Sequence, residues 1–177
     1  MRDSTDMADL PEALIGEFID AAVKDRVRAE QLLSAHPNLI EARWIHDETV
    51  LHFLAIEGFT EAVRFLAERG ADVNAVNEFG DTALSDVVYI GMTDAAEVLL
   101  SHGADPNVSS ETRDCMLDRA VLSGDTRLVA LLLAAGADGR YVTDLGGTVF
   151  DALPESGEER ESMLAILARH GIVPDAS

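Results

Sequence analysis

The sequence predicts an all-α fold, a solenoid of stacked helix-turn-helix units connected by hairpin-like loops. Three observations lead to this fold class. Similar segments recur at intervals of 33 residues. Within each interval the apolar residues follow the spacing of one helix face, and a glycine comes shortly after the second apolar stripe.

The interval is clearest in "TVLHFLAIEG", "TALSDVVYIG" and "CMLDRAVLSG", which begin at Thr49, Thr82 and Cys115. The glycines that close the units keep the same interval, and so do threonines placed where each second helix should begin. These residues are Gly70, Gly103 and Gly136, and Thr60, Thr93 and Thr126. We expect each glycine to end a helix in the left-handed region and each threonine to N-cap a second helix.

The apolar stripes also predict how the units pack. In one unit the stripes are Leu51, Leu54 and Ala55, followed by Val63, Leu66 and Ala67. Because one unit cannot bury both stripes alone, neighbouring units are expected to share a continuous core. A fourth unit begins with "TVFDAL" at Thr148, and its closing glycine, Gly171, comes two residues late.

These motifs resemble the ankyrin repeat, whose signature is a T-P-L-H tetrapeptide and a Gly-Ala-Asp ending. The matching segments are Thr49-Val50-Leu51-His52, Thr82-Ala83-Leu84-Ser85 and three "GAD" triplets. Proline is missing from every tetrapeptide position. Histidine remains only at His52, and the resemblance implies that it forms hydrogen bonds between turns.

The resemblance spans most of the chain and defines its expected organisation. We expect a flexible N-terminus over residues 1–10 and a single ankyrin-repeat domain over residues 11–177. The expected units are a capping unit at about 11–44, repeats at about 45–77, 78–110 and 111–143, and a closing unit at about 144–174. The closing unit is the least regular, as terminal repeats tend to be.

The resemblance further implies that a protein partner binds the hairpin tips and the inner surface of the first helices. These positions combine an apolar strip, centred on Phe79 and Tyr89, with a rim of carboxylates, an arrangement common at protein interfaces. The alternative is that Ile56, Ile90 and Leu122 simply pack against neighbouring repeats. The expected partner-binding residues are Ile45, His46, Glu48, Ile56, Glu57, Glu78, Phe79, Asp81, Tyr89, Ile90, Glu111, Asp114, Leu122, Asp144 and Leu145.

The charge of the chain favours a basic partner. Its 33 acidic and 13 basic residues give a formal net charge of −20, which repels nucleic acid and anionic membranes and attracts basic proteins. The acidity could equally reflect genome composition or adaptation to high salt. The single cysteine, Cys115, excludes an internal disulfide, and no apolar run is long enough to span a bilayer. We expect a cytoplasmic protein that is monomeric when alone.

The residues predict neither catalysis nor a bound cofactor or metal. His46, Asp47 and Glu48 form a weak metal-binding candidate, but they are consecutive and lack the spacing that sets zinc geometry. Cys115 occupies a framework threonine position, which favours a packed side chain over a nucleophile. Carboxylates without a deep pocket do not indicate acid–base catalysis.

The leading hypothesis is therefore a non-catalytic recognition module that binds a basic or amphipathic protein surface. A sharper alternative is a dedicated inhibitor or immunity-type protein that neutralises a cationic enzyme or toxin. Two further alternatives are a metal-dependent enzyme or small-ligand binder, and self-association through the irregular C-terminal unit.

Overall fold

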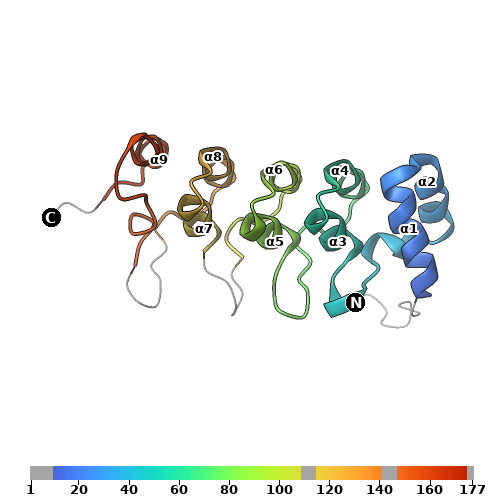
Figure 1. The fold of residues 1–177 in the computed structure, drawn as a ribbon. Coiled ribbons are helices and arrows are strands. Elements are labelled where there is room, and N and C mark those ends of the chain that lie inside the picture. The colour runs from blue at the N-terminus through green and yellow to red at the C-terminus, as the bar shows by residue number, and fades with distance from the viewer. Residues whose placement is uncertain (1–9, 109–114, 141–146, 175–177) are drawn as a thin grey trace.

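The computed structural model describes residues 10–108, 115–140 and 147–174 of the chain. In this part of the chain the helices form pairs that stand side by side in a single row (Figure 1). The second helix of each pair lies in the upper layer of Figure 1 and the first helix in the lower layer, from which the hairpin loops project. The predicted all-α solenoid is confirmed.

The N-terminal pair is built from longer helices than the repeats that follow. Helix α1 spans Glu12–Lys24 and α2 spans Arg26–Ala35, and a 3₁₀ helix, η1, follows at Pro37–Glu41. A short 3₁₀ segment, η2, at Ile45–Asp47 forms the first hairpin tip. The pair packs on the next repeat through contacts of α1 with both of that repeat's helices.

The repeats contribute three regular helix pairs. First helices pack on first helices and second helices on second helices along the row, and a single helix, α9, closes the stack against α8. The helices are α3 (Val50–Ile56), α4 (Thr60–Glu68), α5 (Ala83–Ile90), α6 (Thr93–Ser101), α7 (Met116–Leu122), α8 (Thr126–Ala134) and α9 (Glu158–Arg169).

One continuous hydrophobic cluster runs through the row, from Ile15 in α1 to Ile172 after α9. Each unit contributes side chains that are fully enclosed by its neighbours, so no unit has a core of its own. Examples taken from successive units are Phe18, Leu54, Leu84, Leu117 and Met163.

The threonines that cap helices are not the ones predicted. Thr60 and Thr93 are the first helical residues of α4 and α6, and neither helix has a side-chain cap bond at its preceding residue. Helix α8 is capped instead by Asp125, whose carboxylate accepts from the Leu128 N–H. The prediction for Thr60, Thr93 and Thr126 is therefore wrong by one position, because the turn before each second helix ends one residue earlier than expected.

Capping threonines occur at the first helices. Thr49 and Thr82 each accept from the main-chain N–H three residues on, at His52 and Ser85. The side chains of His52 and Ser85 in turn accept from the threonine N–H, which completes a capping box. Ser85 thus makes the same capping hydrogen bond as His52, although it has no imidazole.

His52 also connects neighbouring repeats. Its Nε2 lies 3.1 Å from the main-chain oxygen of Asp81, and its Nδ1 lies 2.8 Å from the Thr49 hydroxyl. Because a carbonyl oxygen only accepts, Nε2 carries the proton and Nδ1 is the acceptor. The implied hydrogen-bonding role of His52 is confirmed by this geometry. Burial lowers the pKa of His52 below its ordinary value of 6.5, partly offset by the bond to Asp81.

The loops after the second helices are joined by asparagine bridges. Gly70, Gly103 and Gly136 adopt φ of 87°, 89° and 94°, which confirms the predicted left-handed helix ends. The Asn74 amide donates to the Gly103 carbonyl, and its oxygen accepts from the Asp105 N–H. Asn107 repeats this bridge one unit further on, to Gly136 and Asp138.

The closing unit departs from the helix-pair pattern. Residues 149–152 form turns rather than a first helix, because Pro154 disfavours a helical conformation at the residue before it. Val73 and Pro106 are replaced at the matching loop position by Gly139. A Cβ at Gly139 would lie 2.0 Å from Ile172 Cδ1, so the glycine leaves the space that Ile172 occupies.

Among the described residues, no helix combines the length and apolar character needed to cross a bilayer.

Truncation of the shared core should destabilise the whole stack. Leu84 and Leu117 are fully buried in adjacent repeats. We expect Leu84→Ala and Leu117→Ala each to lower the free energy of unfolding by about 2–5 kcal/mol, because each leaves a cavity between units. Urea denaturation measures the change, with Val27→Ala at an exposed site as a control. Losses below about 1 kcal/mol would contradict a shared, close-packed core.

The buried imidazole should make stability depend on pH. The pKa of His52 is lower in the folded protein than in the unfolded chain, so the unfolded chain takes up a proton first as pH falls. The stabilisation is therefore complete above pH 6.5 and is lost as pH falls through the folded-state pKa. Urea denaturation at about pH 7.5 and 5.5 should show a larger loss for wild type than for His52→Gln, at most about 1.4 kcal/mol per pH unit. Parallel losses in the two proteins would show that His52 is not the titrating group.

Candidate protein-binding surface

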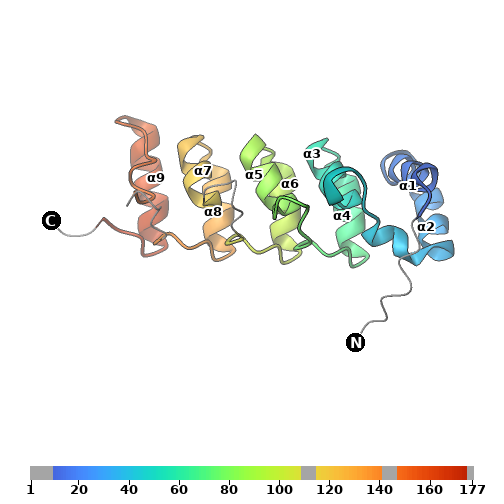
Figure 2. The same ribbon diagram turned by 90° about the horizontal axis from the view of Figure 1, so that it is seen from below.

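The hairpin tips and the ends of the first helices lie on one side of the row. The tips around residues 45–48 and 77–81 project below α3 and α5 in Figure 1, and Figure 2 views the molecule from that side. Helix α5 has eight residues, so about 12 Å of helix separates the tip that precedes it from the residues at its end. We call the tips at 45–48 and 77–81, together with the ends of α3, α5 and α7, the tip surface.

Most of the predicted apolar contact residues are exposed. Phe79 and Tyr89 are each 48% exposed, and Ile45, Ile90 and Leu122 are 62%, 49% and 65% exposed. Such exposure disagrees with the alternative that Ile90 and Leu122 pack against neighbouring repeats. Ile56 is half-buried, so it is partly enclosed by the stack.

Four residues of the predicted acidic rim lie in the described part of the chain. Glu57 and Glu78 are exposed and Glu48 is half-buried, but Asp81 is only 3% exposed. The prediction that Asp81 contacts a partner is therefore wrong, because its N–H and carbonyl oxygen hold the loop together and its side chain is enclosed. The remaining predicted residues, Glu111, Asp114, Asp144 and Leu145, lie outside the described residues.

The tip at 45–48 has an unusual backbone. His46 and Asp47 adopt φ of 56° and 57°, a left-handed conformation that residues other than glycine seldom adopt. In the next tip the residue one period after Asp47 is Gly80, which adopts φ of 78° without a Cβ penalty. Strained residues persist where their surroundings hold them, and such residues cluster at functional sites.

Arg43 and Glu78 hold this tip in place. Arg43 Nη1 donates to the Asp47 carbonyl at 2.5 Å and to its carboxylate at 3.0 Å, and to the Val76 carbonyl at 2.8 Å. The Glu78 N–H donates to the His46 carbonyl at 3.0 Å. The Glu78 carboxylate accepts from His46 Nδ1, and the His46 ring lies 5.4 Å from the Phe79 ring, measured between centroids. These hydrogen bonds join the tips at 45–48 and 77–81 into one unit, which we call the braced platform.

The second tip is fixed by an asparagine. The Asn77 side-chain oxygen accepts from the N–H groups of Phe79 and Asp81, at 2.9 and 3.0 Å. Asn77 N–H also donates to the Asp81 carbonyl at 2.9 Å. This explains how a phenylalanine stands at a turn: the asparagine fixes the loop, so the Phe79 side chain is not needed for packing.

Sequence reasoning missed four residues of this surface. Trp44 and Val76 are 37% and 43% exposed beside the predicted tips. Arg43 braces the first tip. The Arg119 guanidinium lies 4.6 Å from the centre of the Tyr89 ring and donates to the Tyr89 carbonyl at 3.1 Å. Arg43 and Val76 are one period apart, which was the available signal for both; no comparable signal marks Arg119.

One carboxyl group of the tip surface, that of Glu48, is partly buried. Burial raises the pKa of Glu48, and the nearby His46 partly offsets that rise. In the described residues, no group of three His, Cys, Asp or Glu side chains is placed to hold a metal ion. The His46–Glu78 contact brings two potential ligands together, but Asp47 is engaged by Arg43.

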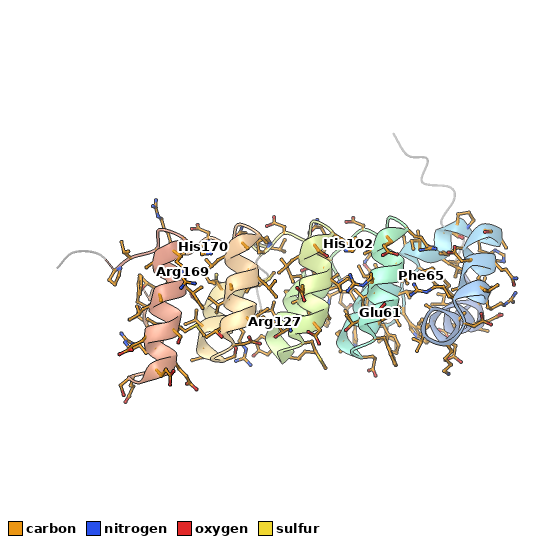
Figure 3. All side chains as sticks on the ribbon, turned by 90° about the horizontal axis from the view of Figure 1, so that it is seen from above. Glu61, Phe65, His102, Arg127, Arg169 and His170 are labelled. Carbon is orange, nitrogen blue, oxygen red and sulfur yellow. The ribbon has the colours of Figure 1, made fainter. Side chains whose placement is uncertain are left out.

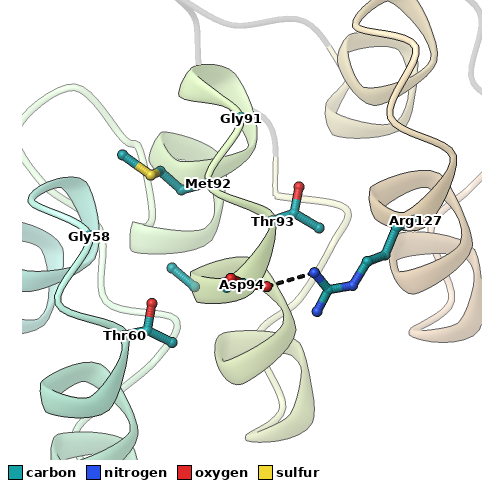
Figure 4. A pocket seen from close by; sticks show the side chains of 8 residues that line it. Gly58, Thr60, Gly91, Met92, Thr93, Asp94 and Arg127 are labelled. Atoms are coloured by element: carbon teal, nitrogen blue, oxygen red, sulfur yellow. Dashed lines mark hydrogen bonds and ion pairs between the residues drawn. The ribbon is translucent and has the colours of Figure 1, made fainter.

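Two hollows in the described part of the chain lie away from the tips. One of about 320 Å³ is lined by Gly58, Met92, Asp94 and Arg127, where the guanidinium of Arg127 pairs with Asp94 at 2.6 Å (Figure 4). Another of about 440 Å³ lies beside it and shares Gly58. Both follow the edge where the two helices of a pair are joined, and both are open to solvent.

The second helices form the opposite layer. Figure 3 shows His102 near the end of α6 and His170 near the end of α9, at the same edge of the row. His102 Nδ1 lies 2.8 Å from the Val98 carbonyl, so this ring closes the end of its own helix. Phe65 is enclosed by the guanidinium groups of Arg26 and Arg69, at 4.4 and 4.0 Å from its centre.

Comparison with known families agrees with the geometry. A family model described as ankyrin repeats in three copies matches residues 19–110 and 51–143. The chain belongs to the ankyrin-repeat family. Ankyrin repeats are protein–protein interaction modules and are typically non-catalytic.

A curated relative shares part of this sequence. Serine/threonine-protein kinase VIK from Arabidopsis thaliana is 37% identical over 62 residues, which is 35% of this chain and 14% of the kinase. The chain thus matches a small part of that protein's length. The similarity supports no statement about kinase activity here.

The left-handed tip residue offers a direct test of the described strain. A β-branched residue is poorly tolerated at positive φ, whereas glycine is accepted. We expect Asp47→Val to lower the free energy of unfolding by about 1–2 kcal/mol, and Asp47→Gly to change it by less than about 0.5 kcal/mol. Thermal or urea unfolding of both variants measures the difference. Equal stabilities for the valine and glycine variants would mean that the backbone at Asp47 is not left-handed.

Proposed function

We propose that the tip surface binds a basic or amphipathic protein segment, with Phe79 as its main apolar anchor. The single observation that carries the proposal is the braced platform of the two tips. It holds an aromatic ring half exposed beside Glu78, with Ile45 exposed on the neighbouring tip. A rigid ring that loses little conformational freedom on binding is typical of interface hot spots.

Charge supports a basic partner. The described acidic residues Glu48, Glu57 and Glu78 border the exposed apolar side chains, and the whole chain has a formal net charge of −20. Long-range attraction would raise the association rate for a cationic protein, while the apolar contacts would slow its dissociation. The module would mask or tether its partner without chemical change.

The two versions of this function differ in affinity. A protein that neutralises a cationic enzyme or toxin should bind it with a dissociation constant of about a nanomolar or less, whereas a scaffold contact can be about micromolar. No feature of the described surface favours the neutralising role over the scaffold. The measured affinity for the partner decides between them.

Removal of the Phe79 side chain should separate binding from folding. Because the ring is 48% exposed and its turn is held by Asn77, we expect Phe79→Ala to change stability by less than about 0.5 kcal/mol. It should weaken partner binding by about 2 kcal/mol, or about thirtyfold. The experiment is capture of partners from the native lysate, followed by calorimetry with the purified partner.

Val27→Ala is the matched control, because Val27 is 68% exposed on α2 and away from the tips. Captures at low salt and at about 0.5 M salt test the charge contribution, since the screening length falls to a few ångströms at the higher salt. Equal capture by wild type, Phe79→Ala and Val27→Ala would overturn the proposal. A partner whose binding is insensitive to salt would remove the basic-partner version.

A further inference from the structure

Two exposed aromatic rings of the tip surface, Phe79 and Tyr89, are each in contact with a nitrogen-bearing side chain from a neighbouring repeat. The His46 ring lies against Phe79, and the Arg119 guanidinium lies over Tyr89. His46 comes from the unit before Phe79, and Arg119 comes from the unit after Tyr89. The two contacts therefore cross repeat boundaries from opposite directions.

The contact at Tyr89 shows which chemistry this surface accommodates. The guanidinium carbon of Arg119 is 4.6 Å from the ring centre, and two of its nitrogens, Nε and Nη2, donate to the Tyr89 carbonyl at 3.3 and 3.1 Å. At Tyr89, an aromatic ring beside a carbonyl oxygen therefore holds a guanidinium. Flat delocalised cations stack on aromatic rings better than an ammonium does.

The Phe79 site has the same two parts and a stronger acceptor. The Phe79 ring provides the aromatic surface and the Glu78 carboxylate the acceptor, on adjacent residues of one fixed loop. His46 Nδ1 donates to that carboxylate while its ring lies 5.4 Å from the Phe79 ring, at an angle of 45° between planes. The side chains of His46 and Glu78 are 56% and 48% exposed, so an approaching molecule can reach both.

We propose that Glu78 and Phe79 form a subsite for an arginine side chain of the partner, and that His46 occupies this subsite in the free protein. This inference rests on the proposed function and names the group that the partner inserts. The incoming guanidinium pairs with the Glu78 carboxylate through two N–H groups and stacks on the Phe79 ring. The His46 ring turns away to solvent, which costs little because the side chain is already more than half exposed.

The choice of arginine over lysine follows from shape. An ammonium is a compact, strongly hydrated charge that would pair with Glu78 but gain less from the ring. A guanidinium uses the carboxylate and the ring together, as Arg119 uses a carbonyl and a ring at Tyr89. Glu48, on the same tip as His46, adds a second carboxylate beside the subsite.

The test measures binding of two defined probes, hexa-arginine amide and hexa-lysine amide, by calorimetry at about 0.15 M salt, where the screening length is about 8 Å. We expect His46→Ala to bind hexa-arginine about fivefold more tightly than wild type, equivalent to about 1 kcal/mol. Hexa-lysine should gain less than twofold. His46→Gly should repeat the gain, because glycine removes the ring and also tolerates the left-handed backbone at this position.

Two further variants assign the gain to the subsite. His36→Ala removes an exposed histidine at the C-terminal end of α2, outside the tip surface, and should leave both affinities unchanged. Phe79→Leu added to His46→Ala should abolish the arginine gain while the thermal unfolding midpoint stays the same. An unchanged or weaker affinity in His46→Ala, an equal gain in His36→Ala, or a gain that survives Phe79→Leu would each overturn the inference.

The outcome is separable from that of the proposed function. If Phe79→Ala loses the native partner while His46→Ala shows no gain for hexa-arginine, the tip surface binds a partner and only the arginine subsite is wrong. If Phe79→Ala keeps the native partner, the proposed function fails whatever the probes show.

Discussion

The structure depends on the burial of apolar surface between units rather than within them. A pair of helices of seven to nine residues, such as α3 with α4, encloses one side of each stripe, and the next pair encloses the other. Helices this short are marginal in isolation, so their persistence requires the neighbouring pair. This stacking imposes a regular spacing on the units, and the alignment of the tips along the row follows from that spacing.

The same constraint explains what the sequence could predict. A shared core demands apolar residues and closing glycines at a fixed interval, so the fold class and the ends of the second helices were readable from the chain. The role of His52 came instead from the resemblance to the ankyrin tetrapeptide. The capping threonines were misplaced because a threonine at the start of a helix and one just inside it look alike in sequence. The closing unit loses its first helix to Pro154, which breaks the pattern where the interval itself becomes irregular.

The candidate surface was less readable than the fold, because exposure at a tip depends on one side chain's direction. Phe79 and Asp81 are two residues apart in one loop, yet the first is 48% exposed and the second 3%. Asn77 sets both outcomes, since its side chain accepts from both N–H groups. The contacts of Arg43 and Arg119 cross repeat boundaries. The interval of 33 residues between Arg43 and Val76 was a signal for the first contact, and no such interval marks the second. Arg43 and Arg119 are therefore part of the tip surface but were absent from the predicted partner-binding residues.

The series of asparagine bridges between loops ends before Arg140. Asn74 and Asn107 each donate to one loop atom and accept from another, and the next position in this series is Arg140. A guanidinium has no acceptor atom, so the two-way bridge cannot be extended to the closing unit. Helix α9 is attached through side-chain packing, with Ile172 in the space left by Gly139. We therefore expect α9 to open locally at a lower free energy than the repeats whose loops are joined by these hydrogen bonds.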